Sequence, residues 1–243
     1  MVNSLKQLHL RFYLISVTFF FVLLYPAFYF YSRKPERYKR LNKFRSVLSL
    51  MSSAGAGIFY RYHYKSKIDW SKPYIICPNH SSNLDIPAVT MLPKGHFAFI
   101  GKDELHSNPL VNLFYKTIDI PINRDSKISA YKAFKKGEDY LKEGVSLVIF
   151  PEGKIADDYP PILHSFKNGP FRLAIEQQVP IIPVSIHKAW KIMWDDGKKY
   201  GSRPGICNIC VHQPIETIGM NIEQADELKD RIYNIINKEI HEN

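Results

Sequence analysis

The chain has 243 residues, 45% of them hydrophobic and 23% charged, which suits one sizeable folded domain with an appendage. A formal net charge of +10 implies an anionic partner, either nucleic acid or a membrane surface with anionic lipids. Three cysteines are too few for the disulfide framework of a secreted protein, so a reducing compartment fits best.

The first predicted element is an apolar helix. From Phe12 to Tyr31 the twenty residues FYLISVTFFFVLLYPAFYFY carry no charge. A helix of that length spans about 30 Å, the thickness of the hydrocarbon core of a bilayer. Aromatic residues gather at both ends, as in interfacial belts, and no small-residue cleavage site of a signal peptide follows. The sequence therefore predicts a membrane helix within residues 1–32.

A basic segment comes next. Residues 33–45 carry seven basic side chains and one acidic. Basic segments that flank a membrane helix stay in the cytoplasm, so we expect the bulk of the protein on the cytoplasmic face of the membrane if this helix spans it. Attraction to lipid headgroups explains the run better than nucleic acid, because no nucleic-acid-binding motif follows. Residues 46–64, rich in small and apolar side chains, are interpreted as a second membrane-associated helix within segment 33–70, forming either a spanning pair or a one-leaflet hairpin.

From residue 71 to residue 243, short β-rich runs alternate with helical stretches. This alternation predicts an α/β fold, a mixed sheet flanked by helices, behind N-terminal membrane-anchoring helices. Continuous apolar runs such as SLVIF and PIIPVSI indicate strands buried on both faces. The terminal helix is expected to begin near Ile222, with Asn221 and Gln224 spaced as a capping box.

Cys207 and Cys210 have the two-residue spacing of half a zinc site. No second such pair exists, and the surrounding GICNICV is typical of a strand, on which residues three apart point to opposite faces. Zinc normally takes four ligands. We therefore interpret both as unpaired thiols and predict no metal.

The first candidate catalytic motif is CPNHSSNLDIP, in which His80 and Asp85 follow the apolar run PYIIC. On a straight helix residues five apart point well away from each other, but at a strand-to-helix turn they can converge. A carboxylate that accepts a hydrogen bond from one imidazole nitrogen leaves the other nitrogen as a base toward a hydroxyl group.

Three further motifs follow in order. IDIPINRD ends a strand near Arg124, LVIFPEGK breaks a strand at Phe150-Pro151-Glu152-Gly153, and FKNGPFRLAIEQQVPIIPVSI contains Lys167 before a helix and a strand. Strand ends that turn through Pro and Gly are where α/β folds place ligand-binding groups.

The four motifs together resemble the 1-acyl-glycerol-3-phosphate acyltransferase family, over Pro73 to Pro183. NHSSNLD matches the family's His-x4-Asp motif and FPEG its third motif. The chain departs from the pattern before the second motif, where the family often has glycine, and after FPEG, where Lys154 and Ile155 replace a hydroxyl residue and arginine. Both departures touch the region that the resemblance assigns to the acceptor phosphate.

The resemblance implies transfer of an acyl chain from acyl-CoA or acyl-carrier protein to a lysophospholipid, 1-acyl-glycerol-3-phosphate, in the membrane. It implies His80 as the base, Asp85 as its orienting group and Arg124 as the phosphate ligand, with no cofactor. The remaining substrate-binding positions that it implies are Phe150, Pro151, Glu152, Gly153, Lys154 and Lys167.

Three alternatives remain open at this point. The acceptor could be another lyso-lipid, such as a lyso-aminolipid. A non-catalytic lipid-binding protein could keep the fold, although it would not need an intact His80–Asp85 pair. A metal-dependent hydrolase is disfavoured, because the sequence has neither an HExxH motif nor clustered carboxylates.

Overall fold

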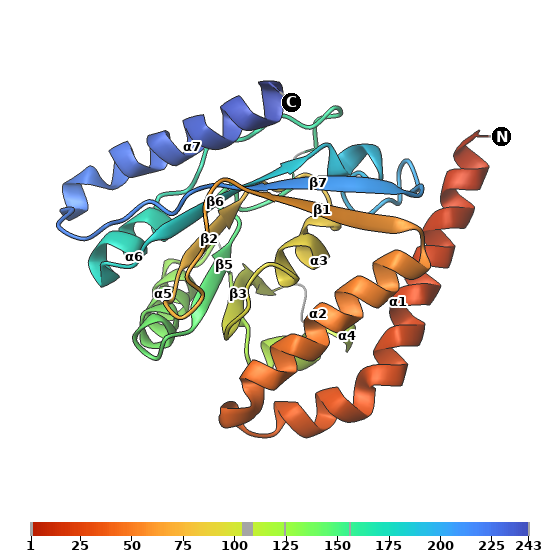
Figure 1. The fold of residues 1–243 in the computed structure, drawn as a ribbon, viewed down its shortest axis with the longest axis horizontal. Helices are drawn as coiled ribbons and strands as arrows, with labels where there is room; N and C mark the ends of the chain where they lie inside the picture. Colours follow the sequence, from red (N-terminus) through yellow and green to blue (C-terminus); the bar gives the residue numbers. More distant parts are fainter. Residues whose placement is uncertain (1, 104–108, 124, 156, 243) are drawn as a thin grey trace.

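A single seven-stranded sheet forms the centre of the protein in a computed structural model that describes residues 2–103, 109–123, 125–155 and 157–242 (Figure 1). Across the sheet the strands are β1 (Ile58–Tyr64), β7 (Gly205–Val211), β6 (Ile181–His187), β2 (Ile75–Pro78), β5 (Ser146–Ile149), β3 (Phe97–Lys102) and β4 (Ile120–Ile122). Neighbours are parallel except β6 and β7, which pair antiparallel. The predicted mixed α/β sheet is confirmed.

Helices cover both faces of this sheet. The helices are α1 (Val2–Ser32), α2 (Tyr38–Gly55), α3 (Asp85–Thr90), α4 (Pro109–Tyr115), α5 (Lys127–Lys142), α6 (Gly169–Gln177) and α7 (Ala225–Glu242), with 3-10 turns at Pro35–Arg37, Ala189–Lys191 and Ile222–Gln224. In Figure 1, α5, α6 and α7 lie on one side of the sheet, while α3 and the N-terminal helices lie on the other. At the start of the last helix, the Gln224 side chain accepts a hydrogen bond from the Asn221 N–H at 2.9 Å, as one half of the predicted capping box requires.

Strand alternation divides the core into two layers. In β2, Ile75 and Cys77 pack with α6 and α7, whereas Ile76 packs with α3. Every residue of β2 and β5 is buried, as the continuous apolar runs predicted. The parallel strands β2 and β5 therefore end side by side, which brings the segments that follow them together.

The prediction of one helix over residues 46–64 is wrong in its second half. Helix α2 ends at Gly55, and Gly57 adopts φ +68, a left-handed conformation that glycine tolerates best. The sequence IFYRYHY then forms β1, which pairs in parallel with β7. The α/β unit consequently begins before residue 71, the boundary that the sequence predicted.

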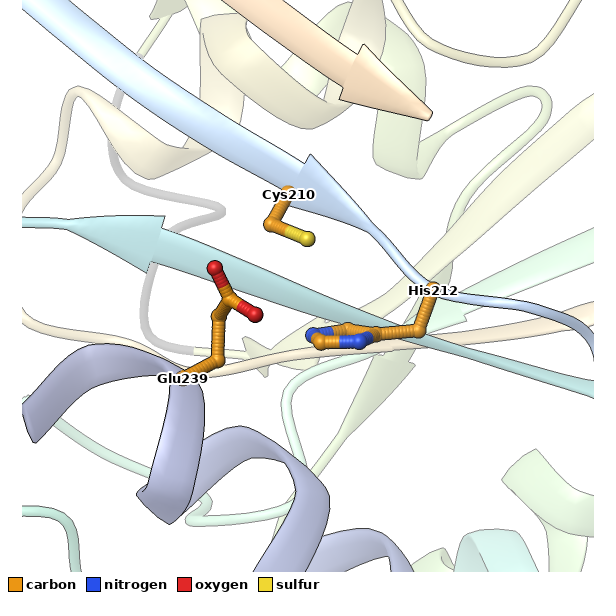
Figure 2. A group of neighbouring side chains, drawn as sticks. All are labelled: Cys210, His212 and Glu239. Atoms are coloured by element: carbon orange, nitrogen blue, oxygen red, sulfur yellow. The ribbon is translucent and has the colours of Figure 1, made fainter. Parts of the chain in front are cut away.

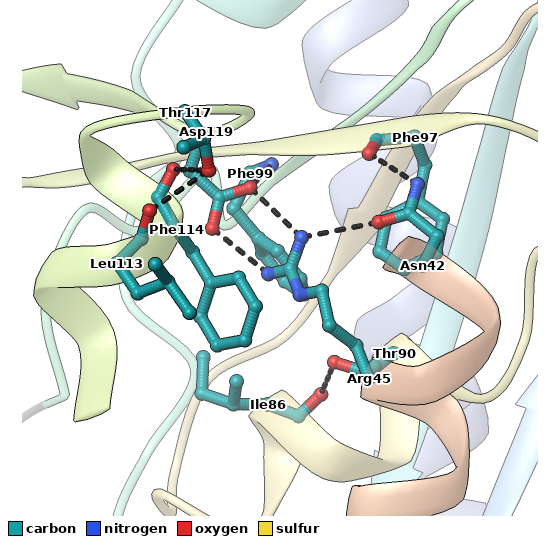
Figure 3. Close-up of polar contacts among 10 residues, drawn as sticks. All are labelled: Asn42, Arg45, Ile86, Thr90, Phe97, Phe99, Leu113, Phe114, Thr117 and Asp119. Carbon is teal, nitrogen blue, oxygen red and sulfur yellow. Dashed lines mark hydrogen bonds and ion pairs between the residues drawn. The ribbon is translucent and has the colours of Figure 1, made fainter. Parts of the chain in front are cut away.

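The basic run is also not uniformly exposed. Arg45 lies on the buried side of α2 and forms a bidentate ion pair with Asp119, with N–O distances of 2.8 and 3.1 Å (Figure 3). Asp119 also accepts the Phe99 N–H at 3.0 Å, and the Arg45 guanidinium lies 4.4 Å from the centre of the Phe114 ring. Arg45 therefore joins α2 to the sheet instead of facing lipid headgroups.

Helix α1 is long and apolar enough to cross a bilayer, the one such helix in the part of the chain that the structure describes. It nevertheless buries one stripe against the rest of the protein along its length, through Leu10, Tyr13, Phe21 and Phe28. At its N-terminal end the Lys6 carbonyl accepts the Ser202 N–H at 2.9 Å. The opposite stripe is exposed and apolar, and includes Phe12, Ile15, Phe19, Val22 and Leu23.

Candidate active site

His80 and Asp85 meet at the turn between β2 and α3. Nδ1 of His80 lies 3.0 Å from Oδ2 of Asp85, the first residue of α3. The same oxygen accepts the backbone N–H groups of Ser81 and Ser82 at 2.7 and 2.8 Å. The predicted convergence of the pair is confirmed.

The aromatic ring of Phe150 supports the imidazole. It stacks on His80 with ring centres 4.0 Å apart and an interplanar angle of 25°. Asp85 is fully buried, whereas the His80 side chain keeps 14% of its surface exposed. With Nδ1 held by Asp85, Nε2 is the nitrogen left to take a proton from a substrate.

Glu152 holds the backbone of the histidine. After β5, its Oε1 accepts the His80 N–H at 2.6 Å and its Oε2 accepts the His164 N–H at 2.9 Å. The carboxyl group is 5% exposed, and this burial raises its pKa to about 7, against the lowering effect of the two N–H donors. Both oxygens are therefore engaged within the protein, a role that the sequence did not predict.

The rest of the third motif shapes the turn. Gly153 is buried and adopts φ +82, where a side chain would be strained. The Pro151 carbonyl accepts the Lys167 N–H at 2.8 Å, which ties the turn to the segment before α6. Phe150, Pro151, Glu152 and Gly153 thus lie beside His80 as a connected turn.

The two lysines predicted to bind phosphate are exposed to solvent, and the predicted arginine lies outside the described residues. The Lys154 side chain is 67% exposed, with Nζ 3.5 Å from Oδ2 of Asp157. Lys167 is exposed, and its backbone makes the contact already described. Arg124 lies outside the described residues, two positions after the end of β4.

A segment that sequence analysis missed, residues 193–195, lies beside the turn that carries His80 and Asp85. The Ser82 hydroxyl donates to the Met193 carbonyl at 2.5 Å, and the Asn83 N–H donates to the Asp195 carbonyl at 2.9 Å. Burial raises the pKa of Asp195 and the nearby Asp196 carboxylate adds to this, whereas the field of His80 lowers it. The segment has no motif that would have revealed it.

Aromatic residues connect this segment to the loop after the third motif. Tyr159 contacts the rings of Trp190, Trp194 and Tyr200, with centres between 4.3 and 5.6 Å apart. These ring contacts join two loops that are each hydrogen-bonded to the candidate site, one through Glu152 and the other through Met193.

Taken together, the site provides an oriented imidazole at the carboxyl ends of parallel strands. That edge is where α/β sheets bind ligands. An imidazole held by a buried carboxylate can remove a proton from a hydroxyl group that attacks a carbonyl carbon.

Comparison with known proteins agrees with this chemistry. The model of the family described as acyltransferase matches residues 59–187, more than half of the chain. The chain belongs to the acyltransferase family. The matched region contains the His80–Asp85 motif and the FPEG turn, which confirms the resemblance seen in the sequence.

Among relatives of this acyltransferase, an uncharacterised acyltransferase of Schizosaccharomyces pombe is 31% identical over 65% of the chain and 56% of its own length. A 1-acyl-sn-glycerol-3-phosphate acyltransferase of Chlamydomonas reinhardtii is 29% identical over 80% of the chain and 57% of its own length. The alpha enzyme of that name from Ovis aries is 28% identical over 67% and 56%. The chain thus spans little more than half the length of these relatives.

The fold of this acyltransferase also matches a solved structure. The crystal structure of the 1-acyl-sn-glycerophosphate (LPA) acyltransferase PlsC from Thermotoga maritima has a TM-score of 0.82 and 23% identity, over 100% of this chain and 97% of that one. At this identity the match establishes the fold.

Proposed function

We propose that this protein transfers a fatty acyl chain from acyl-CoA or acyl-carrier protein to 1-acyl-glycerol-3-phosphate, giving phosphatidic acid. The observation that carries the proposal is the 3.0 Å contact between Nδ1 of His80 and Oδ2 of Asp85. Both residues lie in the region that matches the acyltransferase family, residues 59–187. The names of several relatives support the acceptor.

In the proposed reaction, Nε2 of His80 takes the proton of the free glycerol hydroxyl as its oxygen attacks the thioester carbonyl. The new C–O bond forms as the C–S bond breaks, and the proton passes to the leaving thiolate. Asp85 keeps the imidazole in the required tautomer and stabilises its charged form. Glu152 holds the His80 backbone, so the base is positioned before the substrate arrives.

A membrane location suits this substrate, because acceptor and product both reside in the bilayer. The exposed apolar stripe of α1 provides the contact, and its buried stripe keeps the helix on the protein. Packing along the whole helix favours an orientation within one leaflet over a free-standing span. We further propose that the catalytic domain lies on the cytoplasmic face, with the exposed cations of the basic run against anionic headgroups.

The test is an acyl-transfer assay on the purified protein in lipid vesicles. Acyl-CoA and acyl-carrier protein serve as donors, with lysophosphatidate and a lyso-aminolipid of the same chain length as acceptors. Wild-type protein is expected to prefer lysophosphatidate. His80→Ala should lower kcat by about 10²- to 10⁴-fold, the usual contribution of a general base. His241→Ala, an exposed histidine in α7, is the matched control.

Three results would contradict the proposal in different ways. Near-normal turnover by His80→Ala would exclude the mechanism. A preference for the lyso-aminolipid would leave the proposed acyl transfer in place but would show that the acceptor is not 1-acyl-glycerol-3-phosphate. Lipid binding without turnover by the wild-type protein would indicate a non-catalytic lipid-binding protein.

A further inference from the structure

Beneath the C-terminal end of α7, one face of the sheet carries an unusual set of side chains. In the antiparallel pair, Ser185 lies opposite Cys210 and His187 lies opposite Asn208. Side chains alternate along a strand, so His187 and Ser185 project from the same face as Cys210 and the following His212. Glu239 reaches this face from α7.

The donor atoms of three of these residues converge. Cys210, His212 and Glu239 each offer one ligand atom, and these atoms lie within 4.8 Å of one another (Figure 2). His187 lies beside them, with Nε2 3.6 Å from Oε1 of Glu239. One thiol, two imidazoles and one carboxylate are the donor types that zinc takes in four-coordinate sites.

Burial and charge act in opposite directions on an ion at this group. Cys210 and His212 are 2% and 8% exposed, so their polar atoms are largely removed from water. A surface pocket that His187, Cys210 and Glu239 help to line opens the group to solvent. The same pocket is also lined by cations, so the ligands must hold an incoming ion against their repulsion; these cations are Arg61, Lys65, Lys188, Lys191 and Arg203.

Two side chains beside this cluster, Lys65 and Ser185, already contact its donor groups, so an incoming ion must either displace or accommodate them. Lys65 lies with Nζ 3.4 Å from Oε2 of Glu239, but its side chain is 44% exposed on a flexible stem that can move into solvent. The Ser185 hydroxyl lies 2.8 Å from Nε2 of His212. An ion at Nε2 displaces this hydroxyl, whereas an ion at Nδ1 keeps it as the partner that orients the ring.

We propose that Cys210, His212, Glu239 and His187 bind one Zn²⁺ ion that fastens α7 to the antiparallel edge of the sheet. The ion takes the place of the Lys65 ammonium beside Glu239, and the Cys210 thiol gives up its proton on binding. The site is structural, because α7 supplies one ligand and β6, β7 and the residue after β7 supply the others. This proposal differs from the sequence-based expectation of no metal, which counted cysteines and found no second pair.

The test uses Co²⁺, a spectroscopic substitute for Zn²⁺, on the full-length protein in detergent after removal of any affinity tag and of bound metal by a chelator. We expect one Co²⁺ per chain, a thiolate-to-cobalt charge-transfer band, and loss of the band on adding one equivalent of Zn²⁺. Zn²⁺ should also raise the melting temperature. Cys210→Ser should abolish the band, whereas Cys207→Ser, on the opposite face of β7, is the matched control and should keep it.

The remaining variants test the other ligands. Glu239→Gln and His187→Ala should each weaken Co²⁺ binding by about tenfold or more while the helical circular dichroism is retained. The proposal is overturned if the wild type shows no charge-transfer band, if Cys210→Ser keeps the band, or if neither Glu239→Gln nor His187→Ala changes the affinity. Acyl transfer is not measured, so the outcome is separate from that of the proposed function.

Discussion

Glu152 combines a structural and an ionisable role in one side chain. Its ionised form can accept both the His80 and the His164 N–H, yet burial raises its pKa to about 7 from an ordinary 4.5. Between about pH 4.5 and 7 the folded protein therefore holds a proton that the unfolded chain has released. The free energy of unfolding consequently falls as pH rises through this window.

Glu152→Gln should remove this pH dependence. Its single amide oxygen replaces two acceptors, so one buried N–H loses its partner, at a cost of about 1–3 kcal/mol. The measurement is the melting temperature from pH 5 to pH 8. The difference between wild type and variant should shrink as pH rises, because only the wild type loses stability from this group.

Glu227→Gln, an exposed glutamate at the start of α7, is the matched control and should leave the curve unchanged. A constant difference between wild type and Glu152→Gln across the pH range would mean that Glu152 does not titrate in this window.

At the scale of single elements, α2 is joined to the sheet by the buried pair of Arg45 and Asp119. Breaking a buried ion pair leaves an uncompensated charge, which costs about 3–5 kcal/mol. Arg45→Ala should therefore lower the free energy of unfolding by about this amount in denaturant titration.

Arg40→Ala is the matched control, because Arg40 is an exposed cation of the same basic run and should change stability by less than about 0.5 kcal/mol. The double variant Arg45→Met with Asp119→Asn removes both charges and should be less destabilised than Arg45→Ala. Equal stability of Arg45→Ala and Arg40→Ala would show that the pair contributes little.

At the scale of the whole molecule, α1 has a buried stripe that belongs to the core and an exposed apolar stripe that we propose as the membrane contact. From the sequence alone, deleting residues 1–45 is predicted to release much of the protein from membranes. Such a deletion would remove the buried Phe21, Phe28 and Leu41, so we expect it to expose apolar surface and to cause aggregation.

Membrane binding is better tested on the outer stripe of α1. Ile15 and Val22 are each 65% exposed, so Ile15→Asp with Val22→Asp should leave the core intact. We expect this variant to sediment with lipid vesicles much less than wild type, because charged groups are costly in the bilayer.

Ile218→Asp provides the matched change, since Ile218 is a 74% exposed apolar residue just before the last helix. It should bind vesicles as wild type does. Full sedimentation of the Ile15 and Val22 double variant would place the membrane contact elsewhere on the protein.

Local patterns in the sequence determined much of the fold and the pairing of His80 with Asp85. Buried strands appear as continuous apolar runs, and a helix start appears as a cap, because neighbouring residues control both. His80 and Asp85 were predictable for the same reason: they are five residues apart across one turn. Residues 46–64 were wrongly predicted as one helix. The end of α2, which is rich in small residues, and the aromatic strand β1 follow each other with no charged residue between them to mark the boundary.

Contacts between distant residues were decided only by the tertiary structure. Glu152 bonds to a backbone group 72 positions away, and Arg45 pairs with a carboxylate 74 positions away. The sequence-based interpretation of Cys210 rested on its spacing from Cys207, but the two side chains point to opposite faces of β7. The folded sheet instead places Cys210 near three other residues, namely His187, His212 and Glu239. No spacing in the chain encodes such pairings, because strand order and helix packing bring these residues together only when the whole sheet has formed.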